Sequence, residues 1–246
     1  MFDFSGQRVI VTGGTRGIGA GIVTAFLKAG ATVIATYASN DAAANDFKNK
    51  NEQYAAQLDI QKYDVSSSQA VKDLFKYLDE KYRSLEVLVN NSGIRLDALG
   101  ATMSDEQWQK VLNVNLSGTF YMSREIIPRF MSNRFGRIIN ISSLGGDMGF
   151  QGQANYAASK AGEVALTKSI SKEVAKKGIT VNCVSPGFID TELISDLPDE
   201  QKKEYLKMIP QKRFGKVEEV AYAVLFLATR ESSYINGTSI TVAGGL

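Results

Sequence analysis

Short, continuous apolar runs alternate with longer amphipathic stretches along the whole of this chain. The first run, residues 8–12 (RVIVT), is followed by a helical pattern over residues 17–29 and by a second apolar run at residues 32–37. Strands that are apolar on both faces are typical of a parallel sheet covered by helices on both sides, and a helix between successive strands implies crossover connections. The pattern therefore predicts an α/β fold, a doubly wound parallel sheet that forms a single domain over residues 1–246.

The alternation continues to the last residues, with no linker, repeat or low-complexity segment. A helix is predicted to open at Ser104, where a capping-box pattern begins. Periodicity places the remaining strands at residues 58–65, 85–90, 136–142, 179–184 and 239–242, and the remaining helical stretches at residues 41–53, 67–81, 111–131, 155–177 and 218–229.

Composition excludes several classes of protein. The net charge of +2 gives no reason to expect nucleic-acid binding, and no apolar run is long enough to span a membrane. The single cysteine, Cys183, rules out a disulfide within the chain, and residues 1–6 have no signal-peptide pattern. We therefore expect a cytoplasmic protein in which Cys183 is a buried packing residue.

The chain contains no histidine. Its absence excludes Ser-His-Asp and Cys-His nucleophile systems, and we expect no metal site because imidazole and thiolate are the usual zinc ligands. If the protein is an enzyme, its proton donor must be Asp, Glu, Lys, Tyr or Cys.

Glycines follow the first predicted strand, in residues 12–19 (TGGTRGIG). A glycine-rich turn between a strand and a helix lets a dinucleotide approach the backbone, and the helix N-terminus attracts the pyrophosphate. The alternative is a plain strand-to-helix turn with glycines for geometry alone. The context favours a Rossmann-type dinucleotide site lined by Gly13, Gly14, Thr15, Arg16, Gly17, Ile18 and Gly19.

The end of the second strand indicates which nicotinamide cofactor fits. An NAD site usually has an acid there for the ribose 2′-hydroxyl, but this chain has Tyr37 and Ser39 and no carboxylate before Asp41. Arg16 in the glycine turn can bind a 2′-phosphate, unless it is an ordinary solvated side chain. The prediction is NADP(H), with Tyr37 and Ser39 among its contacts.

Tyr156 and Lys160 lie four residues apart in residues 155–162 (NYAASKAG), so a helix would place them on one face. The small neighbours leave room for a flat ligand. Tyr77 and Lys81 have the same spacing in a charged stretch without small neighbours, so the spacing alone is weak evidence. In a chain without histidine, the pair is nevertheless a candidate proton donor and its cation.

These motifs, taken together, identify the chain as resembling the short-chain dehydrogenase/reductase family over essentially its whole length. Within the family it resembles the 3-oxoacyl-[acyl-carrier-protein] reductases most, with Ser92 in place of the usual alanine. The motifs that carry the resemblance are the glycine turn, residues 90–93 (NNSG), Asn115, Ser143, Tyr156 with Lys160, and Pro186 with Gly187.

The resemblance implies a catalytic set of Asn115, Ser143, Tyr156 and Lys160. Tyr156 would donate the proton to a ketone oxygen, and Lys160 would stabilise its phenolate and bind the nicotinamide ribose. Ser143 would hydrogen-bond the substrate carbonyl, and Asn115 would hold a water that links Lys160 to solvent. Taken singly, a serine at a strand end and a mid-helix asparagine would rather be interpreted as ordinary structural residues, and the functional interpretation depends on Tyr156 and Lys160 in the same chain.

The resemblance also implies further cofactor contacts and a set of surrounding features. A mobile substrate lid is expected at residues 190–211, and Glu163 and Glu173 are expected to be solvent or interface charges. The additional contacts, each after a strand end or on the catalytic helix, are Asp64, Val65, Asn91, Gly93, Tyr156, Lys160, Pro186, Gly187, Ile189 and Thr191.

The implied activity is NADPH-dependent reduction of 3-oxoacyl groups carried on acyl carrier protein in fatty acid biosynthesis, by a homotetramer. Arg134 and Lys177 match basic positions that dock the acidic carrier protein in such reductases, assisted by Arg129 and Lys176. Lys176 and Lys177 could instead merely complement a helix dipole. The alternatives are a reductase of acetoacetyl-CoA or another small ketone, and a non-catalytic NADP-binding sensor.

Overall fold

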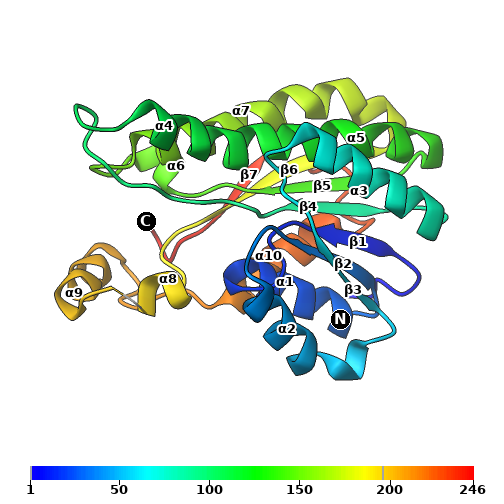
Figure 1. The fold of residues 1–246 in the computed structure, drawn as a ribbon, viewed down its shortest axis with the longest axis horizontal. Coiled ribbons are helices and arrows are strands. Elements are labelled where there is room, and N and C mark those ends of the chain that lie inside the picture. Colours follow the sequence, from blue (N-terminus) through cyan, green and yellow to red (C-terminus); the bar gives the residue numbers. More distant parts are fainter. Residues whose placement is uncertain (1, 196) are drawn as a thin grey trace.

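Across residues 2–195 and 197–246, which the computed structural model describes, seven parallel strands form one sheet in the order β3-β2-β1-β4-β5-β6-β7 (Figure 1). The order reverses between β1 and β4, which defines a doubly wound Rossmann-type sheet. The predicted fold class is confirmed. The strands are β1 (Arg8–Val11), β2 (Thr32–Tyr37), β3 (Leu58–Lys62), β4 (Val87–Asn90), β5 (Gly136–Ile141), β6 (Ile179–Pro186) and β7 (Ser239–Val242).

Helices cover both faces of the sheet (Figure 1). One layer contains α1 (Gly17–Lys28), α2 (Asp41–Lys50) and α10 (Val217–Ala228). The other contains α3 (Ser68–Lys81), α4 (Asp105–Leu112), α5 (Gly118–Asn133) and α7 (Ala154–Val174). Short helices lie in the connections: η1 (Glu52–Tyr54), α6 (Gly145–Met148), η3 (Ala175–Lys177), α8 (Glu192–Ser195) and α9 (Asp199–Met208).

The central strands β1, β2, β4, β5 and β6 supply side chains to two separate cores, because successive strand residues point to opposite faces. In β1, Val9 and Val11 pack into the core beneath α1 and α10, whereas Ile10 packs into the core beneath α3, α5 and α7. All three side chains are fully buried. This two-sided burial is the physical reason that the strands were recognisable as continuous apolar runs.

The long stretch predicted at residues 111–131 is continuous with the helix that opens at Ser104. The Ser104 hydroxyl accepts a hydrogen bond from the Gln107 backbone N–H and completes the capping box. Helix α4 then passes into α5 through one π-helical turn, η2 (Asn113–Ser117). Such turns insert an extra residue and often occur at functional sites, and the sequence pattern contains no sign of this one.

Strand β3 ends at Lys62, earlier than predicted. The Asp64 carboxylate accepts hydrogen bonds from the backbone N–H and the hydroxyl of Ser66, at 2.9 and 2.7 Å. This local turn ends the extended backbone before Val65. Strand β6, in contrast, continues to Pro186 because β7 pairs with it up to that residue.

Glycine is required at the start of β5, where α5 crosses the strand. A Cβ atom on Gly136 would lie 2.1 Å from Cδ2 of Phe130, which is fully buried. Gly136→Ala should therefore lower the free energy of unfolding by about 1–3 kcal/mol, the usual cost of overpacking a core, as measured by urea denaturation. Gly100→Ala is the matched control, because nothing lies within 4 Å of the Cβ position there. Equal stability of the two variants would contradict this packing.

Candidate active site

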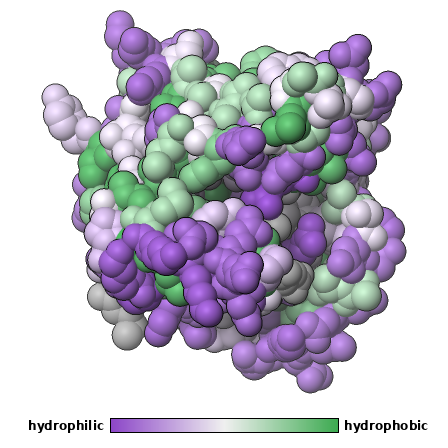
Figure 2. Space-filling view, turned by 90° about the vertical axis from the view of Figure 1, so that its left-hand side faces the viewer, coloured by the Kyte–Doolittle hydropathy of each residue, from purple (hydrophilic) through white to green (hydrophobic). Residues whose placement is uncertain are grey.

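The predicted catalytic and cofactor-binding residues converge at the edge of the sheet where the strands end. This edge lies on the left of Figure 1, beside α6, α8 and α9. Figure 2 shows that end of the molecule, where the surface is hollowed and hydrophilic side chains are prominent below the hollow. Ligands of doubly wound sheets bind at this edge, next to the point where the strand order reverses.

The glycine turn has the geometry of an anion site. Gly13 and Gly17 adopt positive φ angles of 62° and 52°, which glycine tolerates without strain. A Cβ atom on Gly19 would lie 2.1 Å from the Gly13 carbonyl oxygen, so helix α1 can start this close only with glycine there. The N-cap residue of α1, Arg16, makes no side-chain cap, and the first turn has no acidic residue. The first N–H groups of the helix therefore suit a pyrophosphate.

Asn91 holds this turn in place. Its side-chain amide donates to the carbonyl oxygens of Thr12 and Gly13 at 3.0 and 3.1 Å, while the Thr12 hydroxyl accepts from the backbone N–H groups of Asn91 and Ser92. Asn91 was predicted to contact the cofactor, and here its side chain braces the turn against β4. The serine at position 92 leaves these bonds intact.

The end of β2 presents a carboxylate that is already paired. Asp41 accepts a hydrogen bond from the Tyr37 hydroxyl at 2.9 Å and forms an ion pair with Lys62 at 2.9 Å. The Lys62 ammonium and then the Tyr37 hydroxyl lower the pKa of the Asp41 carboxyl. Ser39 is exposed beside this pair, and Arg16 is exposed in the glycine turn. Tyr37, Ser39 and Arg16 therefore lie where the adenosine ribose of a nicotinamide cofactor binds in doubly wound sheets.

Tyr156 and Ser143 border the same space. The Cβ position of Gly145 lies 3.4 Å from the Ser143 hydroxyl oxygen and 3.5 Å from Cε1 of Tyr156. The Ser143 oxygen accepts a hydrogen bond from the Gly145 backbone N–H at 3.1 Å, which orients the hydroxyl. The Tyr156 backbone N–H donates to the Asn155 side chain at 2.7 Å in the first turn of α7. The Ser143 hydroxyl and the Tyr156 ring therefore lie on either side of the same small space beside Gly145.

Asn115 lies in the π-helical turn and is fully buried. Its side chain accepts from the backbone N–H of Ile94 at 2.9 Å and donates to the Ile94 carbonyl and the Ser159 hydroxyl at 3.1 and 3.0 Å. These bonds tie the loop after β4 to α7. The Cβ position of Gly93 lies 3.5 Å from Asn115 Oδ1 and 3.6 Å from Lys160 Nζ, so these groups meet at one point.

Lys160 is 3% exposed and its ammonium points to the sheet. Nζ donates to the carbonyl oxygen of Ile141 at 2.7 Å and to both carboxylate oxygens of Glu163, at 3.0 and 3.1 Å. The prediction that Glu163 is a solvent or interface charge is wrong, because its side chain is fully buried. Position 163 is one helical turn after Lys160 and therefore shares its inward face, whereas Glu173 is exposed as predicted.

Burial and the ion pair shift both pKa values. Burial raises the pKa of the Glu163 carboxyl to about 7, although the Lys160 ammonium opposes this rise. Burial also disfavours the Lys160 ammonium, but Glu163, Tyr156 and Cys183 together more than offset it and raise the pKa of that amine. Cys183 is buried beneath the pair, as predicted, and its thiol lies 3.0 Å from the Thr167 hydroxyl.

The remaining predicted cofactor residues also lie at this edge. Gly187 packs against Ala243, because a Cβ atom on Gly187 would lie 2.8 Å from the Ala243 Cβ. Thr191 faces Gly17 across the crevice, and its Cγ2 would lie 3.9 Å from a Cβ atom on Gly17. Pro186, the last residue of β6, accepts a hydrogen bond from the Leu144 backbone N–H at 3.0 Å. Ile189 and Val65 are buried and Asp64 is exposed.

The segment predicted as a lid, residues 190–211, contains α8 and α9, and Asp196 lies outside the described residues. Three aromatic rings connect it to the site. Phe188 stacks on Tyr205 of α9 with ring centroids 4.3 Å apart, and it also contacts Phe150 at 5.9 Å. The Phe150 ring lies 3.6 Å from the Cβ position of Gly145, beside Ser143 and Tyr156. The sequence analysis did not identify these aromatic residues as neighbours of the site.

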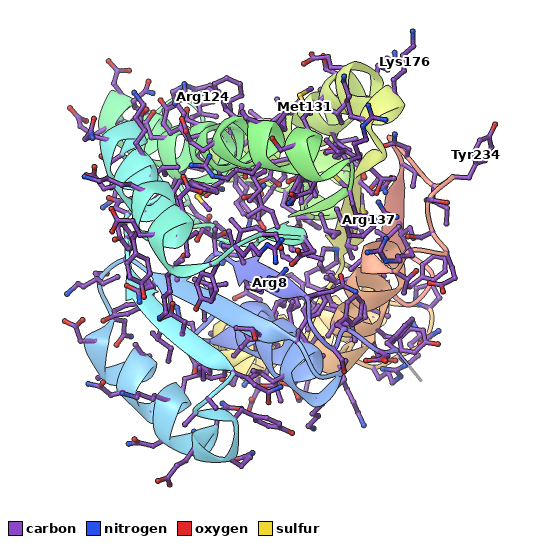
Figure 3. The ribbon with its side chains drawn as sticks, turned by 90° about the vertical axis from the view of Figure 1, so that its right-hand side faces the viewer. Arg8, Arg124, Met131, Arg137, Lys176 and Tyr234 are labelled. Atoms are coloured by element: carbon purple, nitrogen blue, oxygen red, sulfur yellow. The ribbon has the colours of Figure 1, made fainter. Side chains whose placement is uncertain are left out.

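Arg134 and Lys177 lie at the opposite edge of the sheet. Both side chains are exposed. The two residues are neighbours in space, because the Arg134 carbonyl oxygen lies 2.6 Å from the Cβ position of Gly178, the residue that follows Lys177. Figure 3 views this edge, where Lys176 projects from the end of the α7 layer. Lys177 follows Tyr156 by 21 residues, so it is about 30 Å away at ~1.5 Å per residue. Arg129, predicted to assist, is paired with Asp79 at 2.7 Å.

The Tyr77–Lys81 pair has the same spacing as Tyr156–Lys160 and different surroundings. Lys81 donates to the Tyr77 hydroxyl at 2.7 Å and forms an ion pair with Asp59 at 2.9 Å. The lysine side chain is exposed on α3, with no small-residue surround. The context, rather than the spacing, therefore separates the two pairs.

Within residues 2–195 and 197–246, no group of three or more His, Cys, Asp or Glu side chains is placed to hold a metal ion. No helix in these ranges has the length and apolar character needed to cross a membrane.

Comparison with known proteins identifies the family. A family model described as "Enoyl-(Acyl carrier protein) reductase" matches residues 13–246. The chain is 42% identical to the 3-oxoacyl-[acyl-carrier-protein] reductase FabG of Chlamydia pneumoniae over 241 residues, covering 98% of this chain and 97% of that protein. It is also 42% identical to FabG of Thermotoga maritima over 241 residues, 98% of each chain. An acetoacetyl-CoA reductase of Shinella zoogloeoides is 42% identical over 237 residues, 96% of each chain.

These matches extend over nearly the whole chain, and they agree with the strand order and with the motifs at the strand ends. The chain belongs to the short-chain dehydrogenase/reductase family, whose members are oxidoreductases that interconvert alcohols and carbonyl compounds with a nicotinamide cofactor.

Proposed function

We propose that this protein reduces 3-oxoacyl groups carried on acyl carrier protein to 3-hydroxyacyl groups, with NADPH as the reductant, in fatty acid biosynthesis. The observation that carries the proposal is the meeting of Ser143, Tyr156 and Lys160 at the carboxyl edge of the sheet, next to a glycine turn that suits a pyrophosphate. The FabG relatives named above supply the substrate class.

The residues divide the chemistry between them. NADPH, when bound, supplies a hydride to the carbonyl carbon. The Ser143 hydroxyl hydrogen-bonds the carbonyl oxygen as negative charge develops there, and Tyr156 donates a proton to the same oxygen. Lys160 stabilises the resulting phenolate by its charge and binds the nicotinamide ribose. Asn115 contributes by fixing the loop after β4 against α7.

Acetoacetyl-CoA reduction is the second candidate, because relatives of that name are as similar to this chain as the FabG proteins are. A non-catalytic NADP sensor is the least supported alternative, because a protein that only binds the cofactor has no need of the Ser143, Tyr156 and Lys160 arrangement. NADPH oxidation with acetoacetyl-carrier protein, acetoacetyl-CoA and simple sugars, measured side by side, distinguishes all three. Turnover of the carrier-bound substrate at much the highest kcat/KM supports the leading proposal.

We further propose a homotetramer whose subunits pair through α5 and α7. Together with the end of η2, these helices expose a groove of about 610 Å³ lined by Leu116, Ser117, Phe120, Tyr121, Gly162, Ala165, Leu166 and Ser169, with Phe120 40% exposed. An antiparallel pairing of two copies across this groove would carry the Arg134 and Lys177 end of one copy toward the active site of the other. That arrangement would reconcile their proposed docking role with their distance from Tyr156 in one subunit.

Tyr156→Phe should leave NADPH binding intact and lower kcat by about 10²- to 10⁴-fold, because only the proton donor is removed. Tyr77→Phe is the matched control, since it removes a phenol hydroxyl from the other Tyr-x3-Lys pair. Steady-state kinetics and fluorescence titration of NADPH make the measurement. A Tyr156→Phe enzyme with the wild-type kcat would refute the assignment of the proton donor.

NADPH should bind more tightly than NADH, and Arg16→Ala should reduce that preference. Loss of a charge-assisted hydrogen bond costs about 1.5–3 kcal/mol, or about 10- to 150-fold in the Kd for NADPH. The Kd for NADH should change little, because NADH has no 2′-phosphate. Lys28→Ala removes a cation from the far end of α1 and serves as the control. Equal wild-type affinity for the two cofactors would contradict the role of Arg16.

Reversal of charge at Arg134 and Lys177 should raise KM for a carrier-protein substrate at least about tenfold at low salt, since exposed charges act mainly on association. Activity on acetoacetyl-CoA should stay near wild type. The control variant Lys72→Glu with Lys76→Glu makes the same change in charge on the exposed side of α3. Equal losses on both substrates would mean that the two residues support the fold rather than docking.

A further inference from the structure

Glu163 is a buried carboxylate for which the proposed chemistry has no use. Its side chain is fully buried between α7 and the sheet, and its oxygens contact Lys160 and the Thr119 hydroxyl. Burying a charged group is costly unless it is paired. A carboxylate in this position, one turn from a lysine that must serve the crevice, therefore needs an explanation beyond packing.

The ammonium of Lys160 has no hydrogen-bonding capacity left in this arrangement. A lysine ammonium has three N–H donors, and here they are directed to the Ile141 carbonyl and to the two oxygens of Glu163. Nζ lies 5.9 Å from the centroid of the Tyr156 ring. To bind a ribose hydroxyl, Lys160 must give up one of these three bonds, two of which are to Glu163.

Glu163 has a second partner when it is neutral. The single proton of the Thr119 hydroxyl can be donated to the Asn115 carbonyl at 2.7 Å or to Glu163 Oε1 at 3.3 Å, and the shorter contact is the one to the carbonyl. A protonated Glu163 can donate to that oxygen, whereas a carboxylate cannot. The titratable groups that act on the pair are Tyr156 on α7 and Cys183 on β6, the exposed Asp147 on α6 acts only on Cys183, and α5 presents the neutral Thr119.

We propose that Glu163 is a positioning residue that holds the Lys160 ammonium against the sheet while it is ionised, and releases it toward the crevice when it is protonated. The proposal rests on the proposed role of Lys160 in binding the nicotinamide ribose and stabilising the Tyr156 phenolate. Ionisation of Glu163 would then make the affinity for the cofactor depend on pH, and a variant with a neutral residue at position 163 would not show this dependence.

The direction of the effect follows from the charges. The Glu163 carboxyl has a pKa of about 7, so it is mostly neutral below that pH and mostly ionised above it. Wild-type affinity for the cofactor should therefore weaken as pH rises from about 6 to about 8, by between about threefold and tenfold per pH unit in the steepest part. In Glu163→Gln the amide keeps the shape and loses the charge, so this dependence should disappear.

Cofactor binding is the primary measurement, by NADPH fluorescence titration without substrate over this pH range. The 2′-phosphate of NADPH also titrates near these values, but it contributes equally to the wild type and to Glu163→Gln, so the difference between them isolates Glu163. Glu173→Gln, on the exposed side of the same helix, should match the wild type. Glu163→Asp, which keeps the charge, should retain a pH dependence.

The pH–rate profile gives a readout that a merely structural role would not move. In ketone reduction, Tyr156 must be protonated to donate its proton. In Glu163→Gln no carboxylate balances the charge of the Lys160 ammonium, which therefore favours the phenolate form of Tyr156. The alkaline limb of kcat/KM should therefore move to lower pH in that variant. Wild-type pH profiles of both binding and rate in Glu163→Gln would overturn the proposal.

A measurement on the wild type alone keeps the proposal testable if Glu163→Gln does not fold. NADH has no 2′-phosphate, so its affinity should weaken over the same pH range because of Glu163, and a flat profile would overturn the proposal. Binding is measured without a ketone, so these outcomes are independent of whether the substrate is carrier-bound. Failure of the proposed function would show instead as undiminished kcat in Tyr156→Phe.

Discussion

The packing of α7 on the carboxyl end of β5 is the contact on which the rest of the site depends. The Lys160 ammonium bonds the Ile141 carbonyl, and the Ser142 hydroxyl donates to the Lys160 carbonyl at 2.9 Å. Gly146 permits this approach, because a Cβ atom there would lie 2.8 Å from the Ala161 nitrogen. With β5 and α7 locked together, Ser143 and Tyr156 face the same space.

Below this contact, polar side chains continue into the protein. Asn140 of β5 accepts from the Asn90 amide and donates to the Thr167 hydroxyl, each at 2.8 Å, and Thr167 lies against Cys183. Groups buried at this depth are costly unless they are bonded. The pairing of Glu163 with Lys160 belongs to the same layer, where a change of charge has a large effect because little water is present to screen it.

Under the proposed function, the two edges of the sheet would have different tasks. The carboxyl edge gathers the glycine turn, the Ser143–Tyr156 space and the aromatic contact of the α9 segment. The amino edge carries Arg134 and Lys177, which one subunit leaves remote from its own site. A second copy paired along the groove of α5 and α7 is a simple way for both edges to serve one reaction, and it would also cover the exposed ring of Phe120.

The sequence by itself determined the fold class, the glycine turn and the Tyr156–Lys160 pair, because strand burial and helical spacing are local patterns. It also excluded histidine chemistry by composition. Only the tertiary structure decided that Glu163 is buried, that Asn115 lies in the π-helical turn η2, and that Asn91 braces the turn. The burial of Glu163 depends on which face of α7 meets β5, and the π-helical turn leaves no trace in the hydrophobic periodicity. The role of Asn91 depends on its contacts with Gly13 and Thr12, which lie 78 and 79 positions earlier in the chain. Charge and spacing alone do not specify such long-range packing.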